Sequence, residues 1–211
     1  RLSPAQPNGI IKTCVLKASL SHFDFNLFCK ILEEWESYPN LSSCLSHWQN
    51  FTSAGDKLSS LPFHVLLFNV RGLDLRWQEV LLLIASFKFD ALILVETGET
   101  DISFHQKIFQ EYKFLYQKGE NRNGGVLILI KETLSISRIP CSLPNVCVVD
   151  IKGSEKFRLI GIYAPDRKSW SWNYLSSFIS NKCVIYGDFN VDITQDGKKA
   201  DMLLHWADGQ F

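Results

Sequence analysis

Residues 63–95 carry the pattern that most constrains the fold of this chain. Two mostly apolar runs, 63–70 and 91–95, have the length of strands, and continuous apolar runs are typical of a sheet buried on both faces. Between the two runs, apolar residues recur at helical spacing: Trp77, Val80, Leu81, Ile84 and Phe87. Strand, helix and strand in this order predict a β-α-β crossover.

The alternation of strands and helices continues to the end of the sequence. A helix is predicted after Asp101, and glycine and asparagine residues predict turns at 121–125 and at Gly153. Further strands are predicted at 112–116, 126–131, 134–139, 146–152, 157–163 and 183–186, and further helices at 170–179 and 198–206. Residues 61–211 are therefore predicted to form one domain of the α/β class.

Residues 1–60 have a different pattern from the rest of the chain. Two short stripes of apolar residues at helical spacing, around Phe28 and around Cys44, precede a stretch rich in serine and other small residues at 52–60. We expect a short helical segment and a linker, and the pattern assigns no chemistry to this segment.

The balance of charges argues against electrostatic binding of nucleic acid by the chain as a whole. The 211 residues include 22 Lys and Arg and 22 Asp and Glu, so the formal net charge is zero. A local basic cleft is still compatible with this balance.

The sequence has no recognisable signal peptide and no apolar run long enough to span a bilayer. We therefore expect no membrane contact, no secretion, and a nuclear or cytoplasmic location. The sequence begins at Arg1 and its single methionine is Met202, which favours a processed product or a piece of a longer protein.

The six cysteines, at positions 14, 29, 44, 141, 147 and 183, form no C-x-x-C pair. In a chain without an export signal we expect reduced and mostly buried thiols. Cys44 and His47 have the spacing of a metal-ligand pair, but no second pair follows at finger spacing, so the sequence argues against a zinc finger.

Polar side chains follow three of the predicted strands at the point where each strand ends. Asn69 ends the first strand, Glu96 follows the second, and Asp188 and Asn190 follow the last. Active sites of α/β sheets gather at such strand ends. Because Asp188 and Asn190 are two positions apart, both side chains would point to one side of an extended backbone.

Two carboxylates and two carboxamides, without cysteine or histidine, suit a hard cation such as Mg²⁺. A cation held there polarises a phosphate oxygen, while a carboxylate takes a proton from water and an asparagine donates to the charge that develops on phosphate. Structural interpretations compete with this one. Glu96 could be a solvated loop residue, the asparagines could form turns, and Asp188 could cap a local turn.

Five short segments follow one another in a characteristic order: Asn-Val-Arg-Gly-Leu at 69–73, Val-Glu-Thr at 95–97, Gly-Gly-Val at 124–126, Gly-Ile-Tyr-Ala-Pro at 161–165 and Gly-Asp-Phe-Asn at 187–190. Together they resemble the endonuclease/exonuclease/phosphatase superfamily, and most of all the apurinic-endonuclease-like domains of non-LTR retrotransposons. The resemblance covers residues 63–211, and Gly-Asp-Phe-Asn is its most specific part.

The resemblance implies a role for each matching residue. Glu96 is expected to be a metal ligand, with Asn69 supporting the metal site. Asp188 is expected to orient or deprotonate the nucleophilic water, and Asn190 to hydrogen-bond the phosphate in the transition state. Tyr163 is expected near the scissile phosphate, although the strand pattern alone would favour an aromatic residue of the core.

The resemblance also implies a four-layer α/β sandwich of two mixed β-sheets flanked by helices, of which this chain would form a part. Family members end with a further Asp and a Ser-Asp-His run, and this sequence stops at Phe211 before either. His205 has no Ser-Asp before it and is predicted to lie on a helix surface or in packing. Val95 stands where glutamine is commoner in the family. We expect the piece to be weakly stable or weakly active by itself, because missing strands would expose apolar faces and a strand edge.

The activity implied by the resemblance is phosphodiester hydrolysis that depends on Mg²⁺ or Mn²⁺. The expected form is a DNA-nicking endonuclease domain in a retrotransposon-derived polyprotein that also carries a reverse transcriptase. Two alternatives stay open: a phosphatase of the same superfamily that acts on a small phosphate ester, and an inactive remnant of such a domain.

Several residues are candidates for contact with a DNA substrate. Arg71, within the first matching segment, is a candidate substrate contact beside Tyr163 and Asn190. Basic residues that could contact phosphates are Lys152, Lys156, Arg158, Arg167, Lys168, Lys198 and Lys199. Trp170 and Trp172 could stack on bases. A solvated surface and helix packing are the competing interpretations of these two sets.

Overall fold

The computed structural model describes residues 63–153, 156–165, 171–192 and 195–210. The helical segment predicted at 1–60, with Cys44 and His47, lies outside the described residues. The strands are β1 (Val65–Asn69), β2 (Ala91–Val95), β3 (Tyr112–Gln117), β4 (Val126–Lys131), β5 (Ser135–Ile139), β6 (Val146–Lys152), β7 (Lys156–Tyr163) and β8 (Cys183–Asp188). The helices are α3 (Leu73–Ser86), α4 (Ile102–Ile108), the 3₁₀ helix η2 (Trp172–Phe178) and α5 (Gly197–Gln210).

The described strands form two four-stranded mixed sheets. The strand order is β1-β2-β4-β3 in the first sheet and β5-β6-β7-β8 in the second sheet. β1 and β2 run parallel, as do β7 and β8, and the other neighbours run antiparallel. Because α3 connects β1 to the parallel β2, the predicted β-α-β crossover is confirmed.

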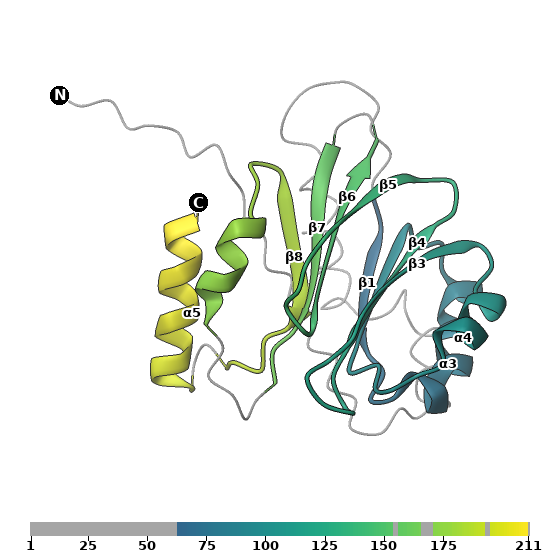
Figure 1. Cartoon of the computed structure of the whole chain (residues 1–211), viewed down its shortest axis with the longest axis horizontal. Helices are drawn as coiled ribbons and strands as arrows, with labels where there is room; N and C mark the ends of the chain where they lie inside the picture. Colours follow the sequence, from purple (N-terminus) through teal and green to yellow (C-terminus); the bar gives the residue numbers. More distant parts are fainter. Residues whose placement is uncertain (1–62, 154–155, 166–170, 193–194, 211) are drawn as a thin grey trace, which may run out of the picture. The chain divides into compact units, whose positions relative to one another are not determined.

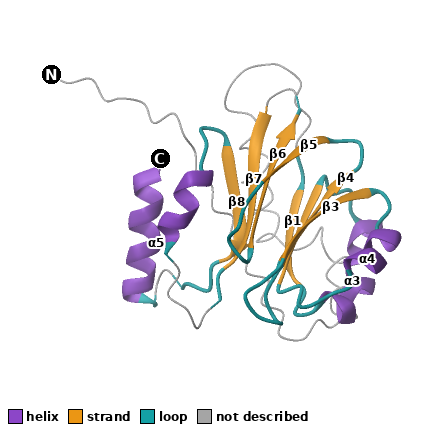
Figure 2. Cartoon of the chain, viewed as in Figure 1, coloured by secondary structure: helices purple, strands orange, loops and turns teal. Residues whose placement is uncertain are grey.

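The two sheets pack face to face between two layers of helices (Figure 1). α3 and α4 cover the outer face of the first sheet, and η2 and α5 cover the outer face of the second sheet (Figure 2). Against the second sheet, Trp172 and Leu175 of η2 and Trp206 of α5 join Ile160 and Ile162 of β7 in one apolar cluster. This is the four-layer α/β sandwich that the resemblance implies.

The two sheets pack closely against each other at Gly161 of β7. A Cβ atom at this position would lie 3.1 Å from the Ile128 Cδ1, Ile93 Cγ2 and Val126 Cγ1 atoms of the first sheet. β2 and β4, the first-sheet strands that face Gly161, are buried at every residue except Lys131. The long apolar runs of these two strands therefore follow from the helices and the second sheet that cover both faces.

Two helical elements differ from the prediction. The helix predicted at 170–179 is the 3₁₀ helix η2, and its buried residues Trp172 and Leu175 are three positions apart, which matches three residues per turn. α5 extends to Gln210, beyond the predicted end at residue 206. No helix among the described residues is long and apolar enough to cross a membrane.

A buried ion pair connects β6 and β7. Asp150 is 2% exposed, and its carboxylate accepts hydrogen bonds from Arg158 Nε at 2.7 Å and Nη2 at 3.3 Å, with Lys156 Nζ at 2.8 Å. The pKa of Asp150 lies below its usual value, mainly because of the hydrogen bonds from Arg158. Burial acts in the opposite direction but is the smaller effect.

Replacing Asp150 by asparagine is expected to lower the free energy of unfolding at pH 7 by about 2 kcal/mol, because two cations lose their charged acceptor. A depressed pKa in the folded state gives stability that is present above the unfolded pKa and is lost as the pH falls through the folded pKa. The difference between parent and Asp150→Asn should therefore shrink below about pH 4. Urea unfolding at several pH values measures it, and the exposed Asp201→Asn is the matched control.

The described cysteines, Cys141, Cys147 and Cys183, are unpaired thiols, as predicted. Cys147 and Cys183 are buried, and Cys141 is partly buried. Burial raises the pKa of the Cys147 thiol to about 12. These thiols fit packing roles better than reactive ones, because the thiolate is the reactive form.

Candidate functional site

The candidate site lies where the two parallel strand pairs end. Asn69 is the last residue of β1, and Glu96 directly follows β2. In the second sheet, Tyr163 and Asp188 are the last residues of β7 and β8 and stand in register with each other. Each sheet therefore contributes two adjacent strand ends to the same edge of the molecule.

The side-chain amide of Asn69 joins the two sheets. Its Nδ2 atom donates to Glu96 Oε1 at 2.7 Å and to Asp188 Oδ2 at 3.3 Å. Its Oδ1 atom accepts from the Arg71 backbone N–H at 3.2 Å, which fixes the orientation of the amide. Since both carboxylates contact one nitrogen, their oxygens lie within a few ångströms of each other. The expectation that Asn69, Glu96 and Asp188 converge agrees with this geometry.

Two neighbouring carboxylates cannot supply all the ligands of a cation, but they can supply some of them. No group of three or more His, Cys, Asp and Glu residues in the described part of the chain could hold a metal ion. Mg²⁺ keeps several waters and is commonly bound by one or two carboxylates together with substrate phosphates. Glu96 and Asp188 fit that mode, and their all-oxygen chemistry favours Mg²⁺ or Mn²⁺ over softer metals.

Tyr163 and Asp188 point into the space between the sheets. Side chains two positions apart on a strand share a face, so Tyr163 shares the face of Gly161, whose missing Cβ would meet Ile93 and Ile128 of the first sheet. Asp188 is paired with Tyr163 across β7 and β8 and therefore shares that face. Tyr163 is partly exposed, so it lies at the rim of the site and does not fill the core.

Asn190 lies beside the site in a conformation different from the predicted one. Its φ is 46°, so the backbone is not extended, and the prediction that Asp188 and Asn190 alternate along extended backbone was wrong. Instead, the Asn190 backbone N–H donates to Asp188 Oδ1 at 3.1 Å. Asn190 Nδ2 donates to the Ala164 carbonyl at 2.8 Å, which uses one of its two hydrogens.

Left-handed backbone marks the same region. The non-glycine residues with positive φ among the described residues are Arg71 at 45°, Glu96 at 54°, Asn145 at 61° and Asn190 at 46°. Such backbone is sparsely populated outside glycine and clusters at functional sites. Arg71, Glu96 and Asn190 are candidates from the sequence, whereas Asn145 is not.

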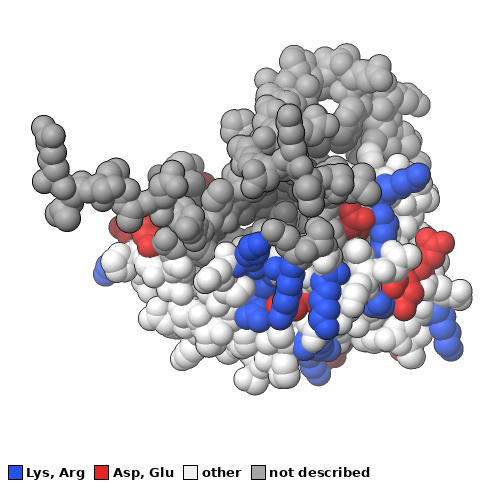
Figure 3. Space-filling view, turned by 90° about the horizontal axis from the view of Figure 1, so that it is seen from above, with Lys and Arg blue, Asp and Glu red and all other residues white. Residues whose placement is uncertain are grey.

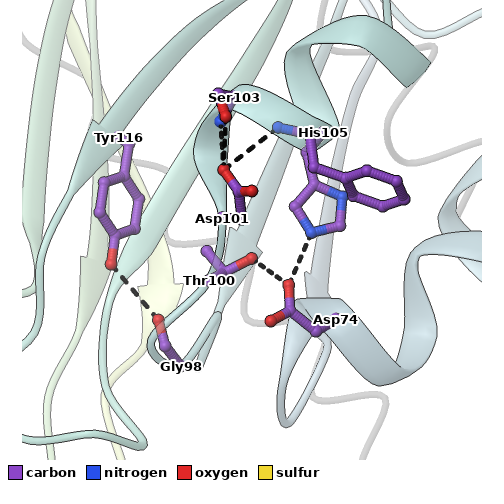
Figure 4. Close-up of polar contacts among 8 residues, drawn as sticks. Asp74, Gly98, Thr100, Asp101, Ser103, His105 and Tyr116 are labelled. Carbon is purple, nitrogen blue, oxygen red and sulfur yellow. Dashed lines mark hydrogen bonds and ion pairs between the residues drawn. The ribbon is translucent and has the colours of Figure 1, made fainter.

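Hydrogen bonds hold the loop that follows Glu96 (Figure 4). Asp74 of α3 accepts from Thr100 Oγ1, and its Oδ1 lies 2.8 Å from His105 Nε2 of α4. Burial raises the pKa of Asp74, but the hydrogen bonds from Thr100 and His105 outweigh it and hold the pKa below its usual value. Asp101 caps α4 through the Ser103 and Phe104 N–H groups.

His105 was not selected from the sequence. It is fully buried, and no local pattern links it to Asp74, which lies 31 positions earlier. Only the packing of α3 against α4 brings the two together.

The basic residues of the second sheet lie away from the site. Arg158 pairs with Cys183 at the start of β7 and β8, whereas Tyr163 pairs with Asp188 at their end, about 17 Å along the strand. Lys152 and Lys156 pair with each other beyond Arg158. Figure 3, seen from above Figure 1, shows lysine and arginine side chains gathered at this far end. These three residues therefore do not line the site.

The remaining candidates for substrate contact differ in their exposure, and some lie outside the described residues. Lys198 and Lys199 are exposed at the start of α5, while Arg167, Lys168 and Trp170 lie outside the described residues. Trp172 is 6% exposed and packs against Phe189 and Trp206, so the packing interpretation is confirmed for it. His205 is exposed on α5, as predicted.

Solved structures of known proteins share this fold. No protein-family model and no curated protein sequence matches the chain. A 3'-5' exonuclease from Neisseria meningitidis matches with a TM-score of 0.52 and 18% identity over 68% of this chain and 70% of that chain. An AP endonuclease from Archaeoglobus fulgidus matches with a TM-score of 0.51 and 19% identity over 68% and 70% of the two chains.

A 3' phosphatase from Neisseria, bound to a product DNA hairpin, matches with a TM-score of 0.51 and 17% identity, again over 68% of this chain and 70% of that one. At such identities the likeness concerns the fold. The described residues share the two-sheet α/β fold of these three solved structures.

Proposed function

We propose that the chain is a phosphodiesterase that depends on Mg²⁺ or Mn²⁺ and hydrolyses DNA. The observation that carries this proposal is the convergence of Glu96 and Asp188 on the amide of Asn69. These residues come from three strand ends in two different sheets, and two carboxylates held so close to each other fit a shared cation. The fold likeness to nucleases supports the same chemistry.

The mechanism assigns a separate task to each residue. Glu96 and Asp188 would hold the cation between them, and Asn69 keeps the two carboxylates at a fixed separation by donating to both. The cation, when bound, polarises a phosphate oxygen and stabilises the departing oxyanion. Asp188 orients the attacking water and takes its proton. Asn190 directs the second hydrogen of its Nδ2 to the charge that develops on phosphate.

Tyr163 and Arg71 would bind the substrate around this centre. Tyr163 lies at the rim beside Asp188, within reach of a phosphate near the nucleophile. Arg71 is exposed, and its backbone N–H is bonded to Asn69, so its guanidinium can contact a neighbouring phosphate from the edge of the site.

DNA is the substrate that the observations favour, because one structural neighbour is a 3' phosphatase bound to a product DNA hairpin, and two others are an AP endonuclease and a 3'-5' exonuclease. The order of the five sequence segments further favours a nicking domain of a retrotransposon-derived polyprotein with a reverse transcriptase. The competing functions are a phosphatase for small phosphate esters and an inactive remnant.

Incubation of the 211-residue chain with supercoiled plasmid tests the proposal. Because the piece is expected to be weakly active by itself, we expect slow, metal-dependent conversion to nicked circles with Mg²⁺ or Mn²⁺, and none with EDTA. Release of inorganic phosphate from inositol phosphates without nicking would favour the phosphatase instead. Neither activity from a folded chain, judged by circular dichroism, would favour the inactive remnant.

A further inference from the structure

Asn145 lies at the junction between the two sheets, in a buried position that the proposed mechanism does not use. It precedes β6, is fully buried, and has a left-handed φ of 61°. Outside glycine, asparagine is among the residue types that adopt this backbone most readily. The left-handed backbone of Asn145 and the burial of its polar side chain both require an explanation.

The hydrogen bonds of Asn145 reach both halves of the site. Its backbone carbonyl accepts from the Tyr163 N–H at 3.0 Å, in the second sheet. Its side-chain Oδ1 accepts from the Gly125 N–H at 2.7 Å, at the edge of the first sheet. The backbone and side chain of one residue therefore connect the two sheets next to Tyr163.

The first-sheet contact continues to Glu96. The Gly125 carbonyl accepts from the Thr97 N–H at 3.4 Å, and the Gly124 carbonyl accepts from the Gly98 N–H at 2.9 Å. Thr97 and Gly98 directly follow Glu96. Asn145 is thus linked through Gly124 and Gly125 to the backbone that sets the position of the Glu96 carboxylate.

Gly124 leaves the space that the Asn145 side chain occupies. A Cβ atom on Gly124 would lie 2.5 Å from Asn145 Oδ1. Asn145 Nδ2 has no hydrogen-bond partner among the described residues, so the side-chain amide forms its hydrogen bond through the oxygen. A buried N–H such as that of Gly125 needs this acceptor because water does not reach it.

We infer that Asn145 is a positioning residue, which holds the Glu96 loop of the first sheet in register with Tyr163 of the second sheet. The inference rests on the proposed function for its catalytic meaning, but the structural linkage can be measured without activity. An acceptor at Oδ1 is the required feature, so aspartate should replace Asn145 and glycine should not.

Amide hydrogen exchange of the full chain is the primary test. Asn145→Gly keeps the backbone carbonyl and tolerates the positive φ, and it removes only the side-chain acceptor. We expect exchange at Gly125, Thr97 and Gly98 to become about tenfold faster, with recovery in Asn145→Asp. Gly124→Ala should give the same pattern by displacing the Asn145 side chain, and it decides the question should Asn145→Gly not fold.

Asn121→Gly is the matched control, because Asn121 Oδ1 accepts from Asn123 and Gly124 in an exposed part of the same loop. Its effect should stay at those two amides. Faster exchange at Gly125 alone in Asn145→Gly and Gly124→Ala, with Thr97 and Gly98 unchanged, would overturn the inference.

Kinetics provide the second readout. If the parent nicks DNA, Asn145→Gly should lower kcat about tenfold with little change in KM, and Asn145→Asp should restore it. An active parent whose kcat is the same in Asn145→Gly would overturn the positioning role. An inactive parent would count against the proposed function, and the exchange measurements would still decide whether Asn145 links the two sheets.

Discussion

Replacing Glu96 or Asp188 by alanine is expected to reduce DNA nicking by about 10²–10³-fold while the chain stays folded. Each change removes one of the two carboxylates that converge on Asn69, so the remaining one cannot hold a cation and activate water at once. Initial rates of plasmid nicking at saturating Mg²⁺ measure the effect. Calorimetric titration with Mn²⁺ should show weaker binding in Glu96→Ala.

Glu99→Ala is the control for this prediction. Glu99 lies on the same loop but is exposed, and its carboxylate forms a surface ion pair with Lys118 at 3.6 Å, so its loss should change the rate less than about twofold. Parent-like rates in both Glu96→Ala and Asp188→Ala would show that these carboxylates are not the catalytic groups.

Replacing Gly161 by valine is expected to lower the free energy of unfolding by about 3 kcal/mol. A Cβ at this position already lies 3.1 Å from three side chains of the first sheet, and the two extra methyl groups of valine must push the sheets apart. Gly161→Ala should have a smaller effect in the same direction. Urea unfolding followed by tryptophan fluorescence gives both values.

Gly209→Ala supplies a control of opposite sign. Gly209 lies within α5 with nothing within 4 Å of its Cβ position, so alanine should stabilise the helix by about 0.5–1 kcal/mol. A chain in which Gly161→Val unfolds at the same urea concentration as the parent would disprove the close packing of the sheets at this point.

The sequence predicted the strands well because burial on two faces leaves a strong signal. The bounds of β2, β4 and β6 are those predicted, and each of these strands is buried at every residue except its last lysine, where it has one. β8 extends two residues further than predicted, to Asp188, because Gly187 and Asp188 still pair with Ile162 and Tyr163. The apolar pattern cannot show strand pairing that continues through a glycine and an aspartate.

The sequence predicted that Asn69, Glu96 and Asp188 come together, but it did not predict the backbone geometry around them. Strand ends identified Asn69, Glu96 and Asp188, since parallel strands end at one edge of a sheet. The left-handed backbone of Glu96 and Asn190 depends on contacts with distant residues, such as the Gly72 N–H that donates to the Glu96 carbonyl at 2.7 Å. The linking position of Asn145 depends in the same way on residues far away in the sequence.

The position of the basic residues also required the structure. Lys152, Lys156 and Arg158 are close in sequence to Tyr163, but they lie at the end of β6 and the start of β7, at the opposite end of the second sheet. Two residues that are close in sequence can lie far apart in space when a strand separates them, because each residue adds about 3.3 Å to the length of the strand.

Asn69 donates to one partner 27 positions away and to another 119 positions away. The closure of such a long loop is slow, so the second contact should form late in folding, after the first sheet has its β-α-β unit. A dication that binds only the assembled pair of carboxylates would then stabilise the docked state of the two halves over any species in which one half is folded alone. The thermal midpoint of the chain should rise with Mn²⁺ concentration, and this coupling between ion binding and assembly should disappear in Asp188→Ala.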